Sequence, residues 1–223
     1  MRTEERHVKA ERMSTDDLIT RLAVEPRPAP GPAGAFGWAP PAALLLTGLP
    51  LLVALGVRSD LATALIDPVT AMKWLLPLAV AGLSMVLAWH LARPEARAGR
   101  RMLLYIPVLL VATGLVAAAL AALPVPDWGT AVRGSTRLVC LASILGMSLG
   151  PLAAALWALR QGASTAPRLS GLLAGLGAGG LAATLYALHC DEDAAPFFVT
   201  WYGLAILAAG GLGALLGPRA LRW

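Results

Sequence analysis

Residues Tyr186-Ala-Leu-His-Cys-Asp-Glu-Asp193 form a short polar stretch between two long apolar runs, at about 169–188 and 196–217. The stretch gathers a thiol, an imidazole and three carboxylates in a chain that is 57% hydrophobic and only 14% charged. That composition is typical of an integral membrane protein rather than a soluble domain. We therefore interpret the stretch as a polar connection between two membrane-spanning helices.

Four similar apolar runs precede this pair, at about 38–57, 70–91, 102–123 and 138–159. Each is long enough to cross a hydrocarbon core about 30 Å thick, which takes roughly 20 apolar residues in a helix. A β-barrel is excluded, because its strands would alternate between apolar and polar residues with a period of two. The sequence predicts an all-α fold: a six-span transmembrane helix bundle, residues 38–223, after a short cytoplasmic N-terminal tail, residues 1–37.

The basic residues predict the orientation of the bundle. Most of the 18 Lys and Arg lie in the tail or after the second, fourth and sixth spans, and only four fall on the other side: Arg58, Lys73, Arg133 and Arg137. The positive-inside rule then places both termini in the cytoplasm. Lys73 lies about one turn from the outer edge of its span, so its ammonium is expected to reach the membrane surface. The net charge of +5 follows from this asymmetry, and we expect no direct binding of nucleic acid.

The tail contains one short amphipathic segment, and Met1 and Met13 are both candidate starts. Ser14-Thr-Asp-Asp17 has a hydroxyl cap and two acids, as at a helix N-terminus. Leu18, Ile19 and Leu22 then form one apolar stripe, and a Pro/Gly linker follows. The stripe either packs on the protein's own inner face or the lipid surface, or is presented to a soluble cytoplasmic partner and orders on binding.

The spans themselves are rich in small residues and poor in charge. Close helix packing in spans four to six is predicted by three spacings: Gly146-xxx-Gly150, Gly171-xxx-Gly175-xxx-Gly179 and Gly213-xxx-Gly217. No span carries Asp, Glu or Arg near its middle, which counts against a transporter or pump. No sequence motif of a catalytic site is present, so we expect that the protein is not an enzyme.

Both cysteines, Cys140 and Cys190, fall on the outer side of the predicted bundle, on sequential antiparallel spans. In one interpretation the two cysteines form a structural disulfide or are two unrelated small residues. In the other interpretation they are a sensor. The sensor is a redox-active pair or a soft-metal site that includes His189. Two Cys and one His are too few to close a structural zinc site, so no resident cofactor is expected, only a transient heavy-metal ion. The acids Asp191, Glu192 and Asp193 are expected to be solvated.

Several of these segments resemble the NrsF family, bacterial inner-membrane anti-sigma factors of extracytoplasmic-function sigma factors. The resemblance runs from about Ser14 to Trp223. It is carried by Thr15-Asp-Asp-Leu-Ile19, Gly150-Pro-Leu152, Leu159-Arg-Gln-Gly162, Tyr186-Ala-Leu-His-Cys190 with Glu192-Asp193, and Trp201-Tyr202.

The resemblance implies a partner and a signal. The tail would hold an extracytoplasmic-function sigma factor inactive at the membrane, through Asp16, Asp17, Leu18, Ile19 and Leu22. Cys140 and Cys190 would register heavy-metal or oxidative stress. The lipid bilayer is the other partner, and the oligomeric state stays open. The alternatives are a small permease or channel, which predicts a polar path through the spans, and a structural membrane scaffold, which predicts that both cysteines are replaceable.

Overall fold

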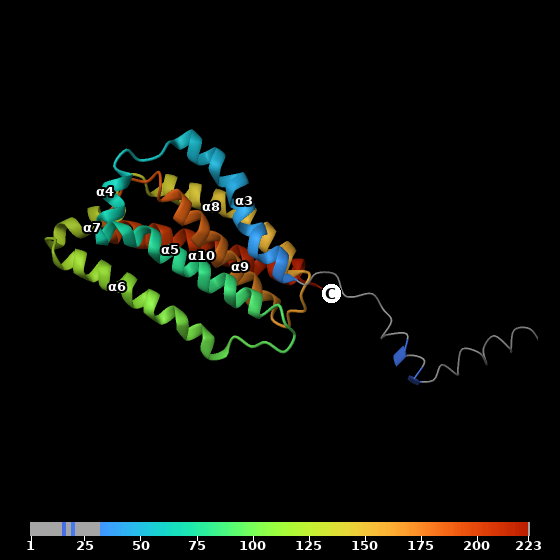
Figure 1. The fold of residues 1–223 in the computed structure, drawn as a ribbon. Coiled ribbons are helices and arrows are strands. Elements are labelled where there is room, and N and C mark those ends of the chain that lie inside the picture. The colour runs from blue at the N-terminus through green and yellow to red at the C-terminus, as the bar shows by residue number, and fades with distance from the viewer. Residues whose placement is uncertain (1–14, 17–18, 21–31, 223) are drawn as a thin grey trace, which may run out of the picture. The chain divides into compact units, whose positions relative to one another are not determined.

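The structure is a computed structural model that describes residues 15–16, 19–20 and 32–222, and it is helical, with no strand among these residues. The chain divides into two units, Met1–Pro30 and Gly31–Trp223. In the first unit, residues 15–16 and 19–20 are helical. The second unit is a helix bundle (Figure 1) with these elements: α3 (Pro32–Leu55), α4 (Leu61–Ile66), α5 (Pro68–His90), η1 (Gly99–Leu104), α6 (Tyr105–Ala121), η2 (Val125–Asp127), α7 (Trp128–Arg133), α8 (Arg137–Leu159), α9 (Pro167–Tyr186) and α10 (Ala195–Ala220).

Six helical segments in the described part are long and apolar enough to cross a membrane. They are Gly34–Leu55, Pro68–His90, Gly99–Ala121, Val125–Leu159, Pro167–Tyr186 and Ala195–Ala220. The predicted all-α fold with six apolar spans is thereby confirmed. The cytoplasmic placement of the tail remains a prediction.

Local sequence sets several of the helix starts. Asp67 is the N-cap of α5, and its carboxylate accepts a hydrogen bond of 2.7 Å from the backbone N–H of Thr70. Pro68 follows at the first helical position, where its missing N–H costs nothing. Proline also stands in the first turn of α9 and of α10, at Pro167 and Pro196.

Helix α9 lies at the centre of the bundle. It packs against α10, α5 and α8, while α3 packs mainly against α8. In Figure 1, α6 runs along the edge of the bundle, where it touches α10 and α5. No residue of α6 is fully buried, so this helix presents most of its apolar side chains outward, while Leu115 and Ala119 pack against the core.

Glycines allow the backbones of α9 and α10 to meet. A Cβ at Gly171 would collide with the carbonyl oxygen of Gly213, and a Cβ at Gly175 with that of Ala209. The close packing predicted from the glycine spacings is therefore present between spans five and six. In span four the prediction is half right. Gly150 lies against Thr47 of α3, but Gly146 has open space around it.

Candidate functional site

The two cysteines come together at one end of the bundle. Cys140 lies in the first turn of α8, and Cys190 lies in the connection between α9 and α10, residues 187–194, which we name the cysteine loop. Both thiols are free, and their sulfur atoms are 3.8 Å apart. Cys140 is 0% and Cys190 3% exposed. A disulfide has an S–S length of about 2.05 Å, so the reduced pair needs only a small approach to bridge.

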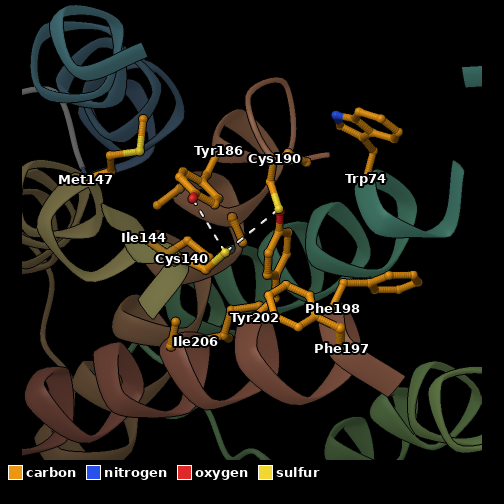
Figure 2. Packing of buried hydrophobic residues seen from close by; sticks show 14 of the residues in the cluster. Trp74, Cys140, Ile144, Met147, Tyr186, Cys190, Phe197, Phe198, Tyr202 and Ile206 are labelled. Atoms are coloured by element: carbon orange, nitrogen blue, oxygen red, sulfur yellow. Dashed lines mark hydrogen bonds between the residues drawn. The ribbon is translucent and has the colours of Figure 1, made fainter. Parts of the chain in front are cut away.

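Three hydroxyl groups surround the sulfur atoms. The Tyr186 hydroxyl donates to Cys140 Sγ over 3.4 Å, and Thr136 Oγ1 lies 3.5 Å from the same sulfur. The Tyr202 hydroxyl is buried without a hydrogen-bond partner among the described residues and points toward the Cys190 sulfur (Figure 2). Hydroxyl donors of this kind stabilise a thiolate more than a neutral thiol.

Apolar side chains close the site against water. Phe197 and Phe198 of α10 and Ile144 and Met147 of α8 are buried in the same cluster as the two cysteines (Figure 2). A Cβ at Gly134, before α8, would collide with the Phe197 ring, and Gly134 has φ +51°. Glycine is thus required at this position for two reasons: the left-handed backbone conformation and the close approach of the Phe197 ring.

Lys73 of α5 reaches into the cysteine loop. Its ammonium donates to the Cys190 carbonyl at 2.6 Å, to the Glu192 carbonyl at 2.9 Å and to Asp193 Oδ1 at 3.0 Å. Its three N–H groups therefore each have an acceptor. The side chain is 0% exposed, so the expectation that Lys73 reaches the membrane surface is wrong. The carbonyls and the carboxylate of the loop offer it better partners inside the protein.

Arg58, between α3 and α4, binds the same loop. Its guanidinium makes two bonds to Asp60, at 2.7 and 2.8 Å, and two to Asp193, at 2.7 and 2.6 Å. A fifth, of 3.2 Å, goes to the Cys190 carbonyl. All five guanidinium N–H donors are thus occupied in a bidentate arrangement.

The charges in this cluster are balanced. Asp193 and Asp60 raise the pKa of Arg58 above its usual value, and the hydrogen bonds from Arg58 lower the pKa of Asp60 to about 2. Burial works against ionisation of Asp193, but hydrogen bonds from Arg58 and Lys73 keep the pKa of this carboxyl below its usual value. Arg58, Asp60 and Asp193 are therefore ionised together.

Glu192 anchors the loop to the start of α8. Its Oε1 accepts from the backbone N–H of Ser135 at 2.8 Å and from the Ser135 hydroxyl at 2.6 Å, and these bonds lower the pKa of the carboxyl. The expectation of three solvated acids is therefore wrong for Glu192 and Asp193. Of the three, only Asp191 is exposed.

The environment distinguishes the two thiols. The hydrogen bond with Cys140 lowers the pKa of the Cys190 thiol, burial opposes this shift, and the Lys73 ammonium adds to it. Cys190 also lies in a loop, whereas Cys140 is fixed in a helix. The position of Cys190 in a loop beside the Lys73 ammonium favours it over Cys140 as the nucleophile of the pair.

His189 makes contacts of its own outside the cysteine pair. Its Nδ1 lies 2.9 Å from the Gly56 carbonyl oxygen, and its ring meets that of Tyr186 edge to face. Because a carbonyl only accepts, Nδ1 carries the hydrogen in this contact. Within the part of the chain that the structure describes, no group of three or more His, Cys, Asp or Glu side chains is arranged to hold a metal ion. A metal at Cys140 and Cys190 stays a prediction and would rest on the two sulfurs.

The predicted sigma-binding residues are only partly described. Asp16 and Ile19 are helical and exposed, and the hydroxyl of Thr20 donates to the Asp16 carbonyl over 2.7 Å. Asp17, Leu18 and Leu22 lie outside the described residues.

Sequence reasoning missed the residues that hold the cysteine loop: Arg58, Asp60, Lys73 and Ser135. One signal could have found two of them. Arg58 and Lys73 are basic residues on the predicted outer side, where positive charge is rare. Three acids follow Cys190 on that same side. Opposite charges confined to one end of an apolar bundle favour pairing.

The fold and the site together define a class: an all-helical protein with six candidate membrane spans and a buried pair of thiols held by charged residues. The sequence model of the NrsF family, described as "Negative regulator of sigma F", matches residues 22–223. The chain therefore belongs to the NrsF family, whose description is regulatory rather than catalytic. The predicted tail segment before residue 22 lies outside that match.

Two curated relatives are similar over almost the whole chain. The "Probable anti-sigma-F factor NrsF" of Azospira oryzae (strain ATCC BAA-33 / DSM 13638 / PS) is 36% identical over 222 residues, which cover 95% of this chain and 100% of the relative. The "Anti-sigma-F factor NrsF" of Caulobacter vibrioides (strain NA1000 / CB15N) is 38% identical over 221 residues, with the same coverage. No solved structure matches the chain.

Proposed function

We propose that this protein is an anti-sigma factor of the bacterial inner membrane that releases its sigma factor when Cys140 and Cys190 are oxidised or bind a heavy metal. Family membership and the names of the two relatives support the anti-sigma part. The observation that carries the sensor part is the distance of 3.8 Å between two buried, free sulfur atoms.

The partner is an extracytoplasmic-function sigma factor bound by the N-terminal tail in the cytoplasm. The distribution of Lys and Arg supports this orientation, with the cysteine loop on the periplasmic side. Ile19 is 57% exposed, which suits a residue that buries its side chain on a partner. Leu18 and Leu22 complete the predicted apolar stripe.

The redox signal is a two-electron oxidation. The Cys190 thiolate attacks a peroxide oxygen and becomes a sulfenic acid, and one oxygen leaves as water or hydroxide. The Cys140 sulfur then attacks the Cys190 sulfur, which forms the disulfide and releases the second oxygen as water. The metal signal needs no electron transfer, because a soft cation displaces one proton from each thiol and is held by both sulfurs.

The first test is capture of the partner by full-length protein in detergent, against the sigma factors of the source bacterium. We expect one sigma factor to be captured specifically and to be lost in the Leu18→Asp/Leu22→Asp variant. Thr20→Asp is the matched control, because it adds a charge outside the stripe. Equal capture by the wild type and the Leu18→Asp/Leu22→Asp variant would contradict binding through the tail, and no capture would contradict the anti-sigma role.

The sensor is tested on the captured complex. Peroxide or cadmium should release the sigma factor from the wild type, and Cys140→Ser and Cys190→Ser should retain it. Release from both serine variants at the wild-type dose would exclude the cysteine pair as the sensor.

A further inference from the structure

We propose that Arg58 and Lys73 are positioning residues for the cysteine pair and that Arg58 couples the state of this pair to α3, the helix that follows the tail. The inference rests on the proposed function and deepens it, since it names the connection between the sensor and the regulatory segment. It is carried by the hydrogen bonds that converge on the cysteine loop.

Both cations meet at one backbone atom. The carbonyl oxygen of Cys190 accepts from Lys73 at 2.6 Å and from Arg58 at 3.2 Å. Asp193, three residues later, binds the same two side chains. The loop is therefore fixed at Cys190 itself and three residues after it, and neither cation has a donor left for another conformation of the loop. Such a loop cannot shift at Cys190 without moving Arg58 or breaking charge-assisted bonds.

The cysteine loop is also bound directly to the end of α3. The backbone N–H of Arg58 donates to the Leu188 carbonyl at 3.0 Å, and His189 Nδ1 contacts the Gly56 carbonyl at 2.9 Å. Gly56 and Arg58 follow within three residues of the last residue of α3, Leu55. Side chain and backbone contacts thus join the loop to one end of α3, whose other end, Pro32, follows the tail in sequence.

The middle of α3 is held by a different helix. The Thr47 hydroxyl donates to the Met147 carbonyl of α8 at 3.3 Å, and Gly150 lets the two helices approach closely at this point. A displacement applied at the Gly56 end therefore tilts α3 about this contact rather than sliding it. The tilt moves the Pro32 end, to which the tail is attached.

Formation of the disulfide supplies the displacement. The two sulfur atoms must approach from 3.8 Å to about 2.05 Å. Cys140 is fixed in a packed helix, so most of the movement falls on Cys190 and its loop. Close-packed interiors transmit such a shift instead of absorbing it, and Arg58 passes it to α3.

The test uses full-length protein in nanodiscs of phosphatidylethanolamine and phosphatidylglycerol, reduced or oxidised with hydrogen peroxide. Mass spectrometry counts the disulfide by the loss of two hydrogens, and hydrogen–deuterium exchange is followed in peptides from α3. We expect oxidation to change exchange in α3 of the wild type. In Arg58→Gln the disulfide should form, but the change in α3 should be about fivefold smaller, a typical size for a lost coupling contact.

Two further variants and one control keep the test decisive if Arg58→Gln folds poorly. Arg58→Lys keeps the charge and one bond to Asp193, so it should restore part of the α3 response, which a merely structural residue would not do. Lys73→Met should slow disulfide formation, because it removes the cation beside Cys190. Arg133→Gln is the control. Its guanidinium bonds only to the Gly129 carbonyl within the described part, and the response should equal that of the wild type.

The outcomes separate this inference from the proposed function. An α3 response of wild-type size in Arg58→Gln and Arg58→Lys, with the disulfide present, overturns the coupling through Arg58 and leaves the sensor intact. A wild-type protein that forms no disulfide overturns the redox function and the inference with it.

Discussion

Helices α9 and α6 are both long apolar segments, yet they occupy opposite positions in the bundle. In its most apolar window α9 is 67% buried and α6 0%. The more hydropathic of the two is α6, so the more apolar helix lies outside. Lipid is as apolar as leucine, and burial in a membrane bundle therefore selects small residues that pack closely rather than large apolar ones. Glycine content, not hydropathy, decides which span lies at the centre.

The largest difference between α9 and α6 is expected when the same large residue replaces a glycine of each helix. Gly175→Leu in α9 should destabilise the protein by more than about 3 kcal/mol or prevent folding, because the new side chain meets the α10 backbone. Gly114→Leu in α6, where no atom lies within 4 Å of the new Cβ, should leave stability unchanged or raise it slightly. Thermal unfolding in detergent measures both, and equal losses would contradict the packing role of Gly175.

A second pair of substitutions tests whether leucine contributes differently to stability in the two helices. Leu173 of α9 is 0% exposed and Leu110 of α6 is 65% exposed. Leu173→Ala should cost about 3 kcal/mol through a cavity in the bundle, whereas Leu110→Ala should cost less than about 0.5 kcal/mol. The same unfolding assay decides, and a larger loss for Leu110→Ala would show that α6 packs on a partner helix.

Lys73 extends the comparison to a buried charge. Helix α5 carries this charge where it contacts the cysteine loop that follows α9, whereas α6 carries no charged residue. Lys73→Met should destabilise by about 2 kcal/mol. This is less than the 3–5 kcal/mol typical of a broken buried ion pair, since Arg58 still binds Asp193. The control Arg133→Gln should be neutral in the unfolding assay. A neutral Lys73→Met would mean that the ammonium is replaceable by an apolar side chain.

Hydropathy and residue spacing along the chain predicted the features of the fold that depend on neighbouring residues in the sequence. The apolar runs predicted the six helices, the spacing of Gly171 and Gly175 predicted the contact with α10, and topology placed Cys140 and Cys190 at the same end. The network around the cysteine loop depends on loops that meet only in the folded chain. Arg58 and Asp193 are 135 residues apart, and no periodicity relates them. A single charged residue near a helix end can also reach the membrane surface instead of a partner inside the protein. This is why the sequence predicted the membrane surface for Lys73.

The smallest expected effect is the pH dependence of stability. It is compared between two carboxylates, one in the connection that follows α9 and one in the connection that follows α6. Paired with Arg58 and Lys73, Asp193 has a pKa below its usual value, so it binds fewer protons folded than unfolded. Its contribution to stability is complete above the ordinary pKa of an aspartate, about 3.9, and is lost as the pH falls through the lower folded value. In wild-type protein the unfolding temperature should therefore fall on acidification below about pH 4 more steeply than in Asp193→Asn. The matched variant Asp127→Asn, after α6, removes a carboxylate without an ion pair in the described part of the chain. It should follow the wild-type curve, and an Asp193→Asn curve parallel to it would show that the ion pairs of the cysteine loop add nothing to folding.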